Sequence, residues 1–454
     1  MNQYLQEWYE KNEQRVFDLM GDIWAHPELG LNTEYAARAT ADFAREEGFA
    51  TVELHAAEDY NNPDARPNTM IATWGSGKPV IGIVGELDAL PNLGQSKEPR
   101  QDPIAGPGHG CGHNLMAGGA MAAASALRYA MEKEGLKGTV KLIETPAEET
   151  GQGKYLLAND GVFEGLDMAL MWHSGPKPLL IDFNPGMVAF TVNFEFFGTS
   201  AHAAGMPWKG RSALDALQLM NIGCEFLREH TEKHVMIHYC ITDGGTAPNI
   251  VPDHAAAKYM FRADKDYDVC YDAVQRGIRI AQGAAMMTDT RMEYHIESVV
   301  PNFYLNIPLS CYVNDAAQKV PPLTYTEEDY KQAEALYANL HPGEPIPDRK
   351  TLIPTEIIPF KGEPTDHCST SDCADMSYYC PAIQIWGLGK VVGTAGHHWT
   401  TTFASSNGIG MRAGLYGYKI LAQTGYDALT NPEIVEKCWE AFKAQNIPEH
   451  PHII

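Results

Sequence analysis

Six side chains that can bind metals or move protons follow short apolar runs of the sequence. They are one thiol, three imidazoles and two adjacent carboxylates: Cys111, His113, Glu148, Glu149, His173 and His397. Thiolate, imidazole and carboxylate together suit zinc, and imidazole with carboxylate also accepts manganese or cobalt. Because five donors exceed the needs of one tetrahedral ion, the set favours a pair of metal ions that activates a water at neutral pH.

The two neighbouring glutamates predict a division of roles. Adjacent side chains on an extended segment point in opposite directions, so one carboxylate could bind metal while the other acts as general base. Each signal alone has a structural explanation, because a Glu pair is commonly solvated and a His after a strand is commonly a hydrogen-bonded core residue. His109 and His398 lie beside the proposed ligands and could replace them.

The elements that must position these side chains alternate between strand and helix. Apolar runs predict buried strands at residues 80–84, 140–143, 168–172 and 382–386, and helical patterns cover residues 14–26, 34–47, 114–133 and 408–423. This order is typical of an α/β domain with a mainly parallel sheet and helices on both faces. Since ligands bind outside the carboxyl ends of such strands, residues distant in sequence should converge on one edge.

The texture of the sequence changes between residues 187 and 302. Residues 187–197 alternate apolar and polar side chains, as a half-exposed strand does. The pattern continues with a helix at 212–230, strands at 236–241 and 255–262, a helix at 267–281 and a strand at 291–299. This β-α-β-β-α-β order predicts an inserted α+β domain of ferredoxin-like type at 187–302, a lid or dimerisation domain, between catalytic segments 1–186 and 303–454. Residues 340–365 are proline-rich and predict a long loop.

Composition limits the classes of protein and partner. The 454 residues include 34 basic and 58 acidic side chains, a net charge of −24, which disfavours nucleic acid and anionic membranes as partners. With 44% hydrophobic and 20% charged residues the chain is expected to fold. The polar first 13 residues predict no signal peptide, and nine scattered cysteines favour a reducing, cytoplasmic location.

As a set, the motifs resemble a known family. The segments G-C-G-H at 110–113, T-P-A-E-E at 145–149, F-G-T-S-A-H-A-A-G at 197–205 and G-G-T-A-P-N-I-V-P-D at 244–253 are similar to those of the dinuclear metallopeptidases of aminoacylase and carboxypeptidase G type, peptidase family M20. Cys111 in place of an aspartate resembles the amidohydrolase branch. Departures from the pattern are Asn114 for an aspartate, Ala395 for a proline, and Glu86 near a metal-binding histidine of the carboxypeptidases.

The resemblance implies a role for each matched residue. Two divalent ions, zinc or manganese, would be held by Cys111, His113, Glu149, His173 and His397. Glu148 would act as general base, and Asp88 and Glu86 would contact the ligands rather than the metal. His202 of the inserted domain would polarise the scissile carbonyl, often across a dimer, and Asn249 and Arg262 would bind a substrate carboxylate. Without the resemblance, His202 could be a surface histidine, Asn249 a turn residue, and Arg262 a partner of Asp264.

The implied activity is hydrolysis of the amide of an N-acyl amino acid with an aromatic acyl group, such as aminobenzoyl-glutamate. A dipeptidase or a general N-acyl-amino-acid deacylase could use the same residues. A different class of function is an inactive metal-binding partner of a homologous hydrolase. The expected partners are an acyl-amino-acid or peptide substrate and another protein chain, in a homodimer or a hetero-oligomer with a homologous chain.

Overall fold

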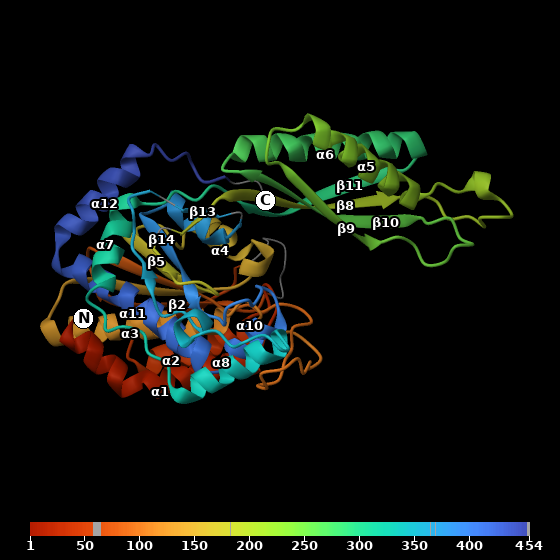
Figure 1. Cartoon of the computed structure of the whole chain (residues 1–454). Coiled ribbons are helices and arrows are strands. Elements are labelled where there is room, and N and C mark those ends of the chain that lie inside the picture. The colour runs from red at the N-terminus through yellow and green to blue at the C-terminus, as the bar shows by residue number, and fades with distance from the viewer. Residues whose placement is uncertain (58–64, 182, 364, 368, 452–454) are drawn as a thin grey trace. The chain divides into compact units, whose positions relative to one another are not determined.

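The computed structural model describes residues 1–57, 65–181, 183–363, 365–367 and 369–451 (Figure 1). The chain divides into two compact units. Unit 1 comprises Met1–Asn184, Tyr304–Asp366 and Asp375–Glu449, and unit 2 comprises Pro185–Phe303, His367–Ala374 and His450–Ile454. The boundaries at 184/185 and 303/304 lie within two residues of those expected from the sequence, and unit 2 also takes the short segment from 367 to 374.

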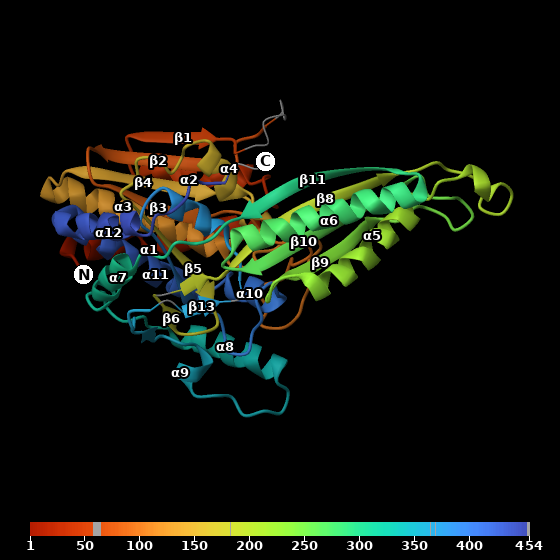
Figure 2. The same ribbon diagram turned by 90° about the horizontal axis from the view of Figure 1, so that it is seen from above.

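Unit 1 is built on an eight-stranded sheet with the order β1-β2-β4-β3-β5-β14-β6-β12. Its strands are β1 (Thr51–His55), β2 (Thr69–Ser76), β3 (Val80–Glu86), β4 (Gly138–Thr145), β5 (Met168–Gly175), β6 (Leu179–Leu180), β12 (Ile357–Ile358) and β14 (Ala382–Gly389). The central strands β4, β3, β5 and β14 are mutually parallel, whereas β1 and β2 run antiparallel at one edge (Figure 2). The expected mainly parallel sheet is confirmed.

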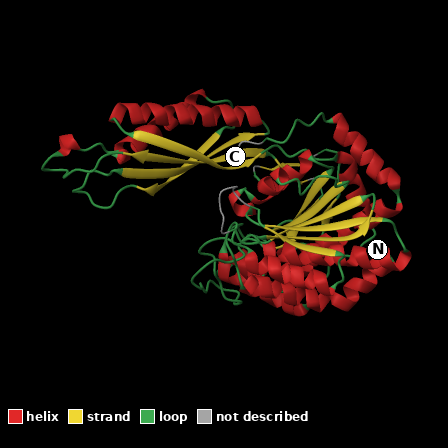
Figure 3. Cartoon of the chain, turned by 180° about the vertical axis from the view of Figure 1, so that it is seen from behind, coloured by secondary structure: helices red, strands yellow, loops and turns green. Residues whose placement is uncertain are grey.

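Helices cover both faces of this sheet (Figure 3). They are α1 (Gln3–Ala25), α2 (Glu34–Glu46), α3 (His113–Glu134), α4 (Gly153–Asn159), α7 (Ile307–Ala317), α8 (Glu327–Leu340), α9 (Arg349–Leu352), α10 (Trp399–Ala404), α11 (Gly408–Thr430) and α12 (Pro432–Ala444). Helix α3 packs between α1 and α11, and a Cβ on Gly118 or Gly119 would come within 2.4 Å of Met20 or Tyr418. The small residues of α3 therefore permit this close packing.

Unit 2 has the β-α-β-β-α-β order that the sequence predicts. Its elements are β8 (Met187–Phe197), α5 (Ala213–Leu227), β9 (Met236–Asp243), β10 (His254–Asp264), α6 (Tyr267–Thr288) and β11 (Arg291–Val300). The strands form an antiparallel sheet in the order β11-β8-β10-β9, and both helices lie on one face (Figure 1). Alternate residues of β10 are buried, so one face of the sheet supplies the core of this unit.

The structure also differs from the expected elements. Helix α1 begins at Gln3 rather than near residue 14, because Leu5, Trp8 and Tyr9 already belong to its buried face. The segment 340–365 is not a plain loop, since it contains α9 and β12. Helices α7, α8 and α12 were not expected. No helix in the described residues is long and apolar enough to cross a membrane.

Glu144 of β4 gives a testable pH dependence. Its side chain is fully buried beside Gly85 on the α3 face of the sheet, and neither carboxyl oxygen has a hydrogen-bond partner among the described residues. Burial, together with nearby Glu86, raises the pKa of Glu144 well above its usual 4.5. A raised pKa means that the folded state holds a proton the unfolded chain releases, so stability falls as pH rises above the unfolded pKa.

We therefore expect Glu144→Gln to gain thermal stability relative to the wild type as pH rises from 5 to 8. Glutamine has nearly the same shape but never ionises, so it does not lose stability by this route. Thermal unfolding followed by circular dichroism at each pH measures the difference. A stability difference that stays constant with pH, or shrinks as pH rises, would contradict this explanation.

Candidate metal centre

The loops after four parallel strands meet at one edge of the unit 1 sheet. Asp88 follows β3, the glutamate pair follows β4, His173 lies in β5 and His397 follows β14. Cys111 and His113 stand at the start of α3, where Gly112 has a φ of +98° and a Cβ would lie 3.0 Å from Ser174 Oγ. A glycine is therefore needed at this turn for both donors to reach the edge.

Asp88 joins three of these segments through its carboxylate. Oδ1 accepts the backbone N–H of Glu148 (3.2 Å) and Oδ2 accepts that of Glu149 (3.1 Å). His113 Nδ1 lies 2.9 Å from the Asp88 carbonyl oxygen and 3.1 Å from Oδ1. A carbonyl oxygen can only accept, so Nδ1 carries the proton and Nε2 presents its lone pair to the cluster.

The nitrogen and sulfur donors of the cluster lie close together. Cys111 Sγ is 3.3 Å from His173 Nε2, and the His113 and His173 rings meet edge to face at 5.8 Å. His173 Nδ1 lies 2.9 Å from the Ser174 carbonyl oxygen, which fixes the proton on Nδ1 and directs Nε2 toward Cys111. Ser174 Oγ in turn donates to the Cys111 carbonyl at 2.8 Å.

The carboxylates complete the cluster. His113 Nε2 is 3.8 Å from both Glu148 Oε2 and Glu149 Oε1, and Glu149 Oε2 is 3.2 Å from His397 Nε2. Ala147 and His397 both have left-handed backbone conformations, with φ of +52° and +53°. Such strain at non-glycine residues is concentrated at functional sites, and here it aims Glu148 and His397. The His397 side chain is 59% exposed, so the cluster opens to solvent on this side.

The electrostatics of the cluster call for a cation. Burial raises the pKa of Glu149 to about 7, and burial together with the Glu149 carboxylate raises the pKa of the Cys111 thiol to about 12. Glu149 Oε1, Glu86 Oε2 and His113 Nε2 are buried without a hydrogen-bond partner. Three groups of donor atoms lie within 4.8 Å of one another: Cys111 with His113 and His173, Cys111 with Glu149 and His397, and Glu86 with His113 and Glu148. These residues fit divalent metal ions.

Some details differ from the sequence expectation. Glu148 and Glu149 lie in a short 3₁₀ helix rather than an extended segment, because both N–H groups bind Asp88, and both carboxylates approach His113. The alternative donors are turned elsewhere. His109 Nε2 lies 3.2 Å from the Ile23 carbonyl oxygen, and His398 Nδ1 lies 3.0 Å from Thr400 Oγ1.

Two lysines near the cluster were missed. Lys154 of α4 is fully buried and its Nζ lies 2.6 Å from Glu86 Oε1. Lys390, directly after β14, is also buried, and burial lowers its pKa while Cys111 and Glu149 oppose this. The available signal was a lysine inside an apolar segment next to a strand end or a ligand motif.

In unit 2, the structure brings His202 and Asn249 together. Ala203 N donates to the Asn249 carbonyl oxygen at 3.0 Å, and His202 forms an isolated bridge with Ile250. His202 is exposed, and its Nδ1 accepts the backbone N–H groups of Ala204 (3.2 Å) and Gly205 (3.0 Å). In the neutral ring the proton is therefore on Nε2, which becomes a hydrogen-bond donor.

Arg262 does not join this pair. It lies opposite Ala189 at the start of β8, whereas His254 lies opposite Phe197 at the end of β8. At roughly 3.3 Å per residue, the eight residues from His254 to Arg262 span about 26 Å. The loops that carry His202 and Asn249 extend from the Phe197 end of the sheet (Figure 2). Arg262 Nε contacts Met260 Sδ, and among the described residues no carboxylate lies within ion-pairing distance, Asp264 included.

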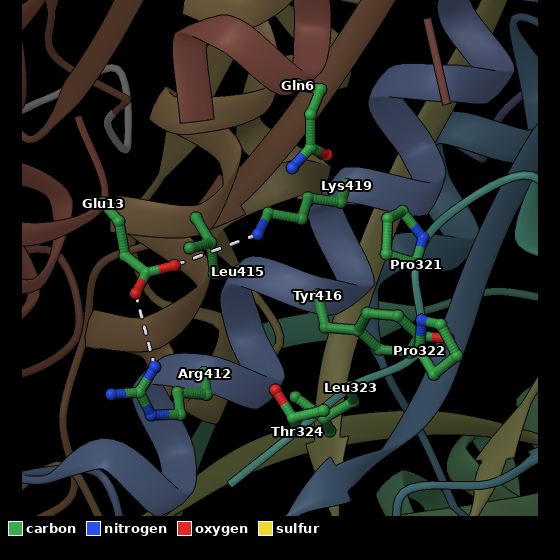
Figure 4. A pocket seen from close by; sticks show the side chains of 10 residues that line it. All are labelled: Gln6, Glu13, Pro321, Pro322, Leu323, Thr324, Arg412, Leu415, Tyr416 and Lys419. Carbon is green, nitrogen blue, oxygen red and sulfur yellow. Dashed lines mark hydrogen bonds and ion pairs between the residues drawn. The ribbon is translucent and has the colours of Figure 1, made fainter. Parts of the chain in front are cut away.

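A separate hollow of about 170 Å³ in unit 1 lies away from the donor cluster (Figure 4). It is formed by α1, α11 and residues 321–324. Its cations already have partners, because Glu13 lies 3.3 Å from Arg412 and 3.9 Å from Lys419. None of the proposed metal ligands lines it.

Comparison with known proteins agrees with this geometry. Residues 82–452 match peptidase family M20/M25/M40. The chain is 31% identical to one of the chains of p-aminobenzoyl-glutamate hydrolase of Escherichia coli, over 96% of this chain and 93% of the relative, and 28% identical to Xaa-Arg dipeptidase of Mus musculus, over 95% and 90%. A solved structure from Bacillus subtilis, a dinuclear metal-binding peptidase from family M20, has the same fold, with a TM-score of 0.57, 18% identity and coverage of 93% and 99%. The chain therefore belongs to peptidase family M20/M25/M40 and is a metallo-amidohydrolase or peptidase that acts on amide bonds.

Proposed function

We propose that the protein hydrolyses the amide between an aromatic acyl group and an amino acid with a free carboxylate, as in aminobenzoyl-glutamate. The observation that carries this proposal is the pair Glu148 and Glu149, each 3.8 Å from His113 Nε2 inside a cluster of thiol, imidazole and carboxylate donors. The 31% identity with the p-aminobenzoyl-glutamate hydrolase chain supports the substrate class.

Cys111, His113, Glu149, His173 and His397 would hold two divalent ions, zinc or manganese. Cys111 is common to two of the three donor groups, which supports two ions with a shared ligand rather than one ion. When bound, such ions lower the pKa of water and polarise a carbonyl oxygen.

Glu148 would take the proton from the attacking water and pass it to the leaving amine. Its carboxylate lies beside the donors without joining the group of Cys111, Glu149 and His397, which supports a role in proton transfer rather than in metal binding. The backbone N–H of Glu148 bound to Asp88 would keep the carboxylate at this position through the reaction.

His202 would donate its Nε2–H to the oxygen of the scissile carbonyl as negative charge develops there. The support is the pair of backbone N–H groups at Nδ1, which maintain the donor tautomer without a protonated ring. Asn249 and Arg262 would bind the substrate carboxylate, for which a guanidinium fork is well suited.

Because Asn249 and Arg262 lie at opposite ends of one sheet, one copy of unit 2 cannot bring both to one carboxylate. This separation supports an assembly in which another protein chain supplies His202 and Asn249, either a homodimer or a hetero-oligomer with a homologous chain. The relative's name, which designates part of a multi-chain hydrolase, is consistent with such an assembly. A cytoplasmic location is part of the same proposal, since the cysteine usage favours a reducing compartment.

The second candidate activity is that of a dipeptidase, which the 28% identity with Xaa-Arg dipeptidase favours. A general N-acyl-amino-acid deacylase would need the same catalytic groups. An inactive partner chain is disfavoured by Glu148, because a purely structural metal site does not need a second carboxylate beside its ligands.

We expect purified protein supplied with Mn²⁺ or Zn²⁺ to release amine fastest from aroyl-amino acids, in a panel that also contains indoleacyl-, acetyl- and aminoacyl-amino acids. Glu148→Ala should lose at least about 10² in kcat, the usual contribution of general-base catalysis, while its metal content stays unchanged. Faster turnover of dipeptides would favour the second candidate activity. Near-wild-type turnover by metal-loaded Glu148→Ala would show that Glu148 is not the base.

Divalent ions should also stabilise the fold. Chelator-treated protein is expected to unfold at a lower temperature, because Glu149 Oε1 and His113 Nε2 are then buried without partners. An ion at about 100 times its Kd adds about 2.7 kcal/mol of stability. Differential scanning calorimetry with and without MnCl₂ measures the shift, and His398→Ala serves as a control outside the cluster. An equal shift in His173→Ala and wild type would argue against a site at His173.

Substitution of His202 tests the carbonyl donor. His202→Ala should lower kcat roughly 10²–10³-fold, the usual cost of removing one oxyanion donor. His202→Gln, which retains an N–H donor, should keep more activity than His202→Ala. Steady-state kinetics with an aroyl-amino acid decides the matter, and a change confined to KM would contradict this role.

A further inference from the structure

Glu86, the last residue of β3, has an unusual environment. Its side chain is fully buried, and one oxygen, Oε1, accepts a hydrogen bond from Lys154 Nζ at 2.6 Å. Lys154 comes from α4 and is fully buried as well. The other oxygen, Oε2, lies 3.2 Å from His113 Nε2 and has no hydrogen-bond partner among the described residues.

The geometry around His113 excludes a simple hydrogen bond as the full explanation. The Nδ1 proton of His113 is directed at the Asp88 carbonyl, so in the neutral ring Nε2 carries a lone pair. A lone pair and a carboxylate oxygen at 3.2 Å repel each other unless a positive charge lies between or beside them. Glu86, His113 and Glu148 also form one of the three groups of donor atoms within 4.8 Å.

Lys154 explains how this carboxylate stays in place. A buried carboxylate without a cation is strongly destabilising, and the ammonium at Oε1 offsets that cost while fixing the direction of Oε2. One ion pair leaves Oε2 unsatisfied, which is the arrangement expected of an oxygen that awaits a metal ion.

We propose that Glu86 contributes Oε2 as an additional ligand to the ion held by His113, and that Lys154 is the positioning residue of Glu86. This inference rests on the proposed two-ion site but not on the proposed substrate. The ion at His113 then has more carboxylate oxygens around it than the ion beside Cys111 and His397, so the two positions differ in chemistry.

The positioning role of Lys154 can be separated from a general electrostatic role by the sign of one effect. If Lys154 only adds positive charge near the centre, Lys154→Met removes repulsion and strengthens the binding of cations. If Lys154 positions Glu86, the same substitution releases the carboxylate and weakens binding. Methionine has a similar length and no charge, so the packing of α4 changes little.

The test is titration of chelator-stripped full-length protein with MnCl₂, followed by calorimetry, with bound metal counted by mass spectrometry. Wild type should bind two ions. Glu86→Gln should bind one of them 10–100-fold more weakly and the other as wild type does, and Lys154→Met should weaken the same ion.

Glu144→Gln is the matched control, because it also replaces a buried carboxyl of the same sheet. Glu144 lies opposite Gly85 in the register of β3 and β4, so its side chain and that of Glu86 point to opposite faces. This variant should bind both ions normally.

The double variant Glu86→Gln/Lys154→Met keeps the inference falsifiable if Lys154→Met alone fails to fold, because it removes both buried charges together. Its metal affinity should equal that of Glu86→Gln, since Lys154 acts only through Glu86. Loading with Co²⁺ adds an independent readout, in which the thiolate-to-cobalt absorption from Cys111 should persist in every variant.

Three outcomes would overturn the inference: wild-type affinity for both ions in Glu86→Gln, tighter binding in Lys154→Met, or additive losses in the double variant. Wild-type protein that binds two ions yet hydrolyses no amide of the panel would overturn the proposed function alone. Wild-type protein that binds no ion would overturn both.

Discussion

The candidate site depends on the buried carboxylate of Asp88. Its two oxygens accept the backbone N–H groups of Glu148 and Glu149, and one of them also contacts His113 Nδ1. Three segments that lie far apart in the sequence are thus held by one side chain that is itself only 1% exposed. Hydrogen bonds of this kind to an ionised group are stronger than neutral ones, and they set both the tautomer of His113 and the backbone course of the glutamate pair.

The parallel sheet makes this convergence possible. Strands β3, β4, β5 and β14 all end at one edge, so four loops deliver their side chains to the same place. The close packing of α3 against its neighbours fixes the start of that helix, and with it Cys111 and His113. The left-handed conformations of Ala147 and His397 are maintained by this surrounding structure.

Much of this arrangement could be predicted from the sequence. The apolar runs identified the central strands, and the carboxyl-end rule located Cys111, Glu149 and His173 at one edge. Hydrophobic periodicity did not reveal α7 and α12, which pack mainly on α11 and not on the sheet. The 3₁₀ turn at Glu148 was also hidden, because it depends on hydrogen bonds to Asp88, 60 residues earlier. Two further features required the three-dimensional register. The pairing of Lys154 with Glu86 joins α4 to β3, and no local pattern links positions 68 residues apart. The separation of Asn249 from Arg262 follows from the strand register of unit 2, whereas the sequence only indicated that both could bind a carboxylate.

The central claim is that one sheet edge holds two ions through residues from separate loops. Anomalous diffraction from crystals of the full chain grown with MnCl₂ tests it most directly. We predict two anomalous peaks about 3.5–4 Å apart, surrounded by Cys111, His113, Glu149, His173 and His397. A single peak, or ions bound away from these side chains, would contradict the account.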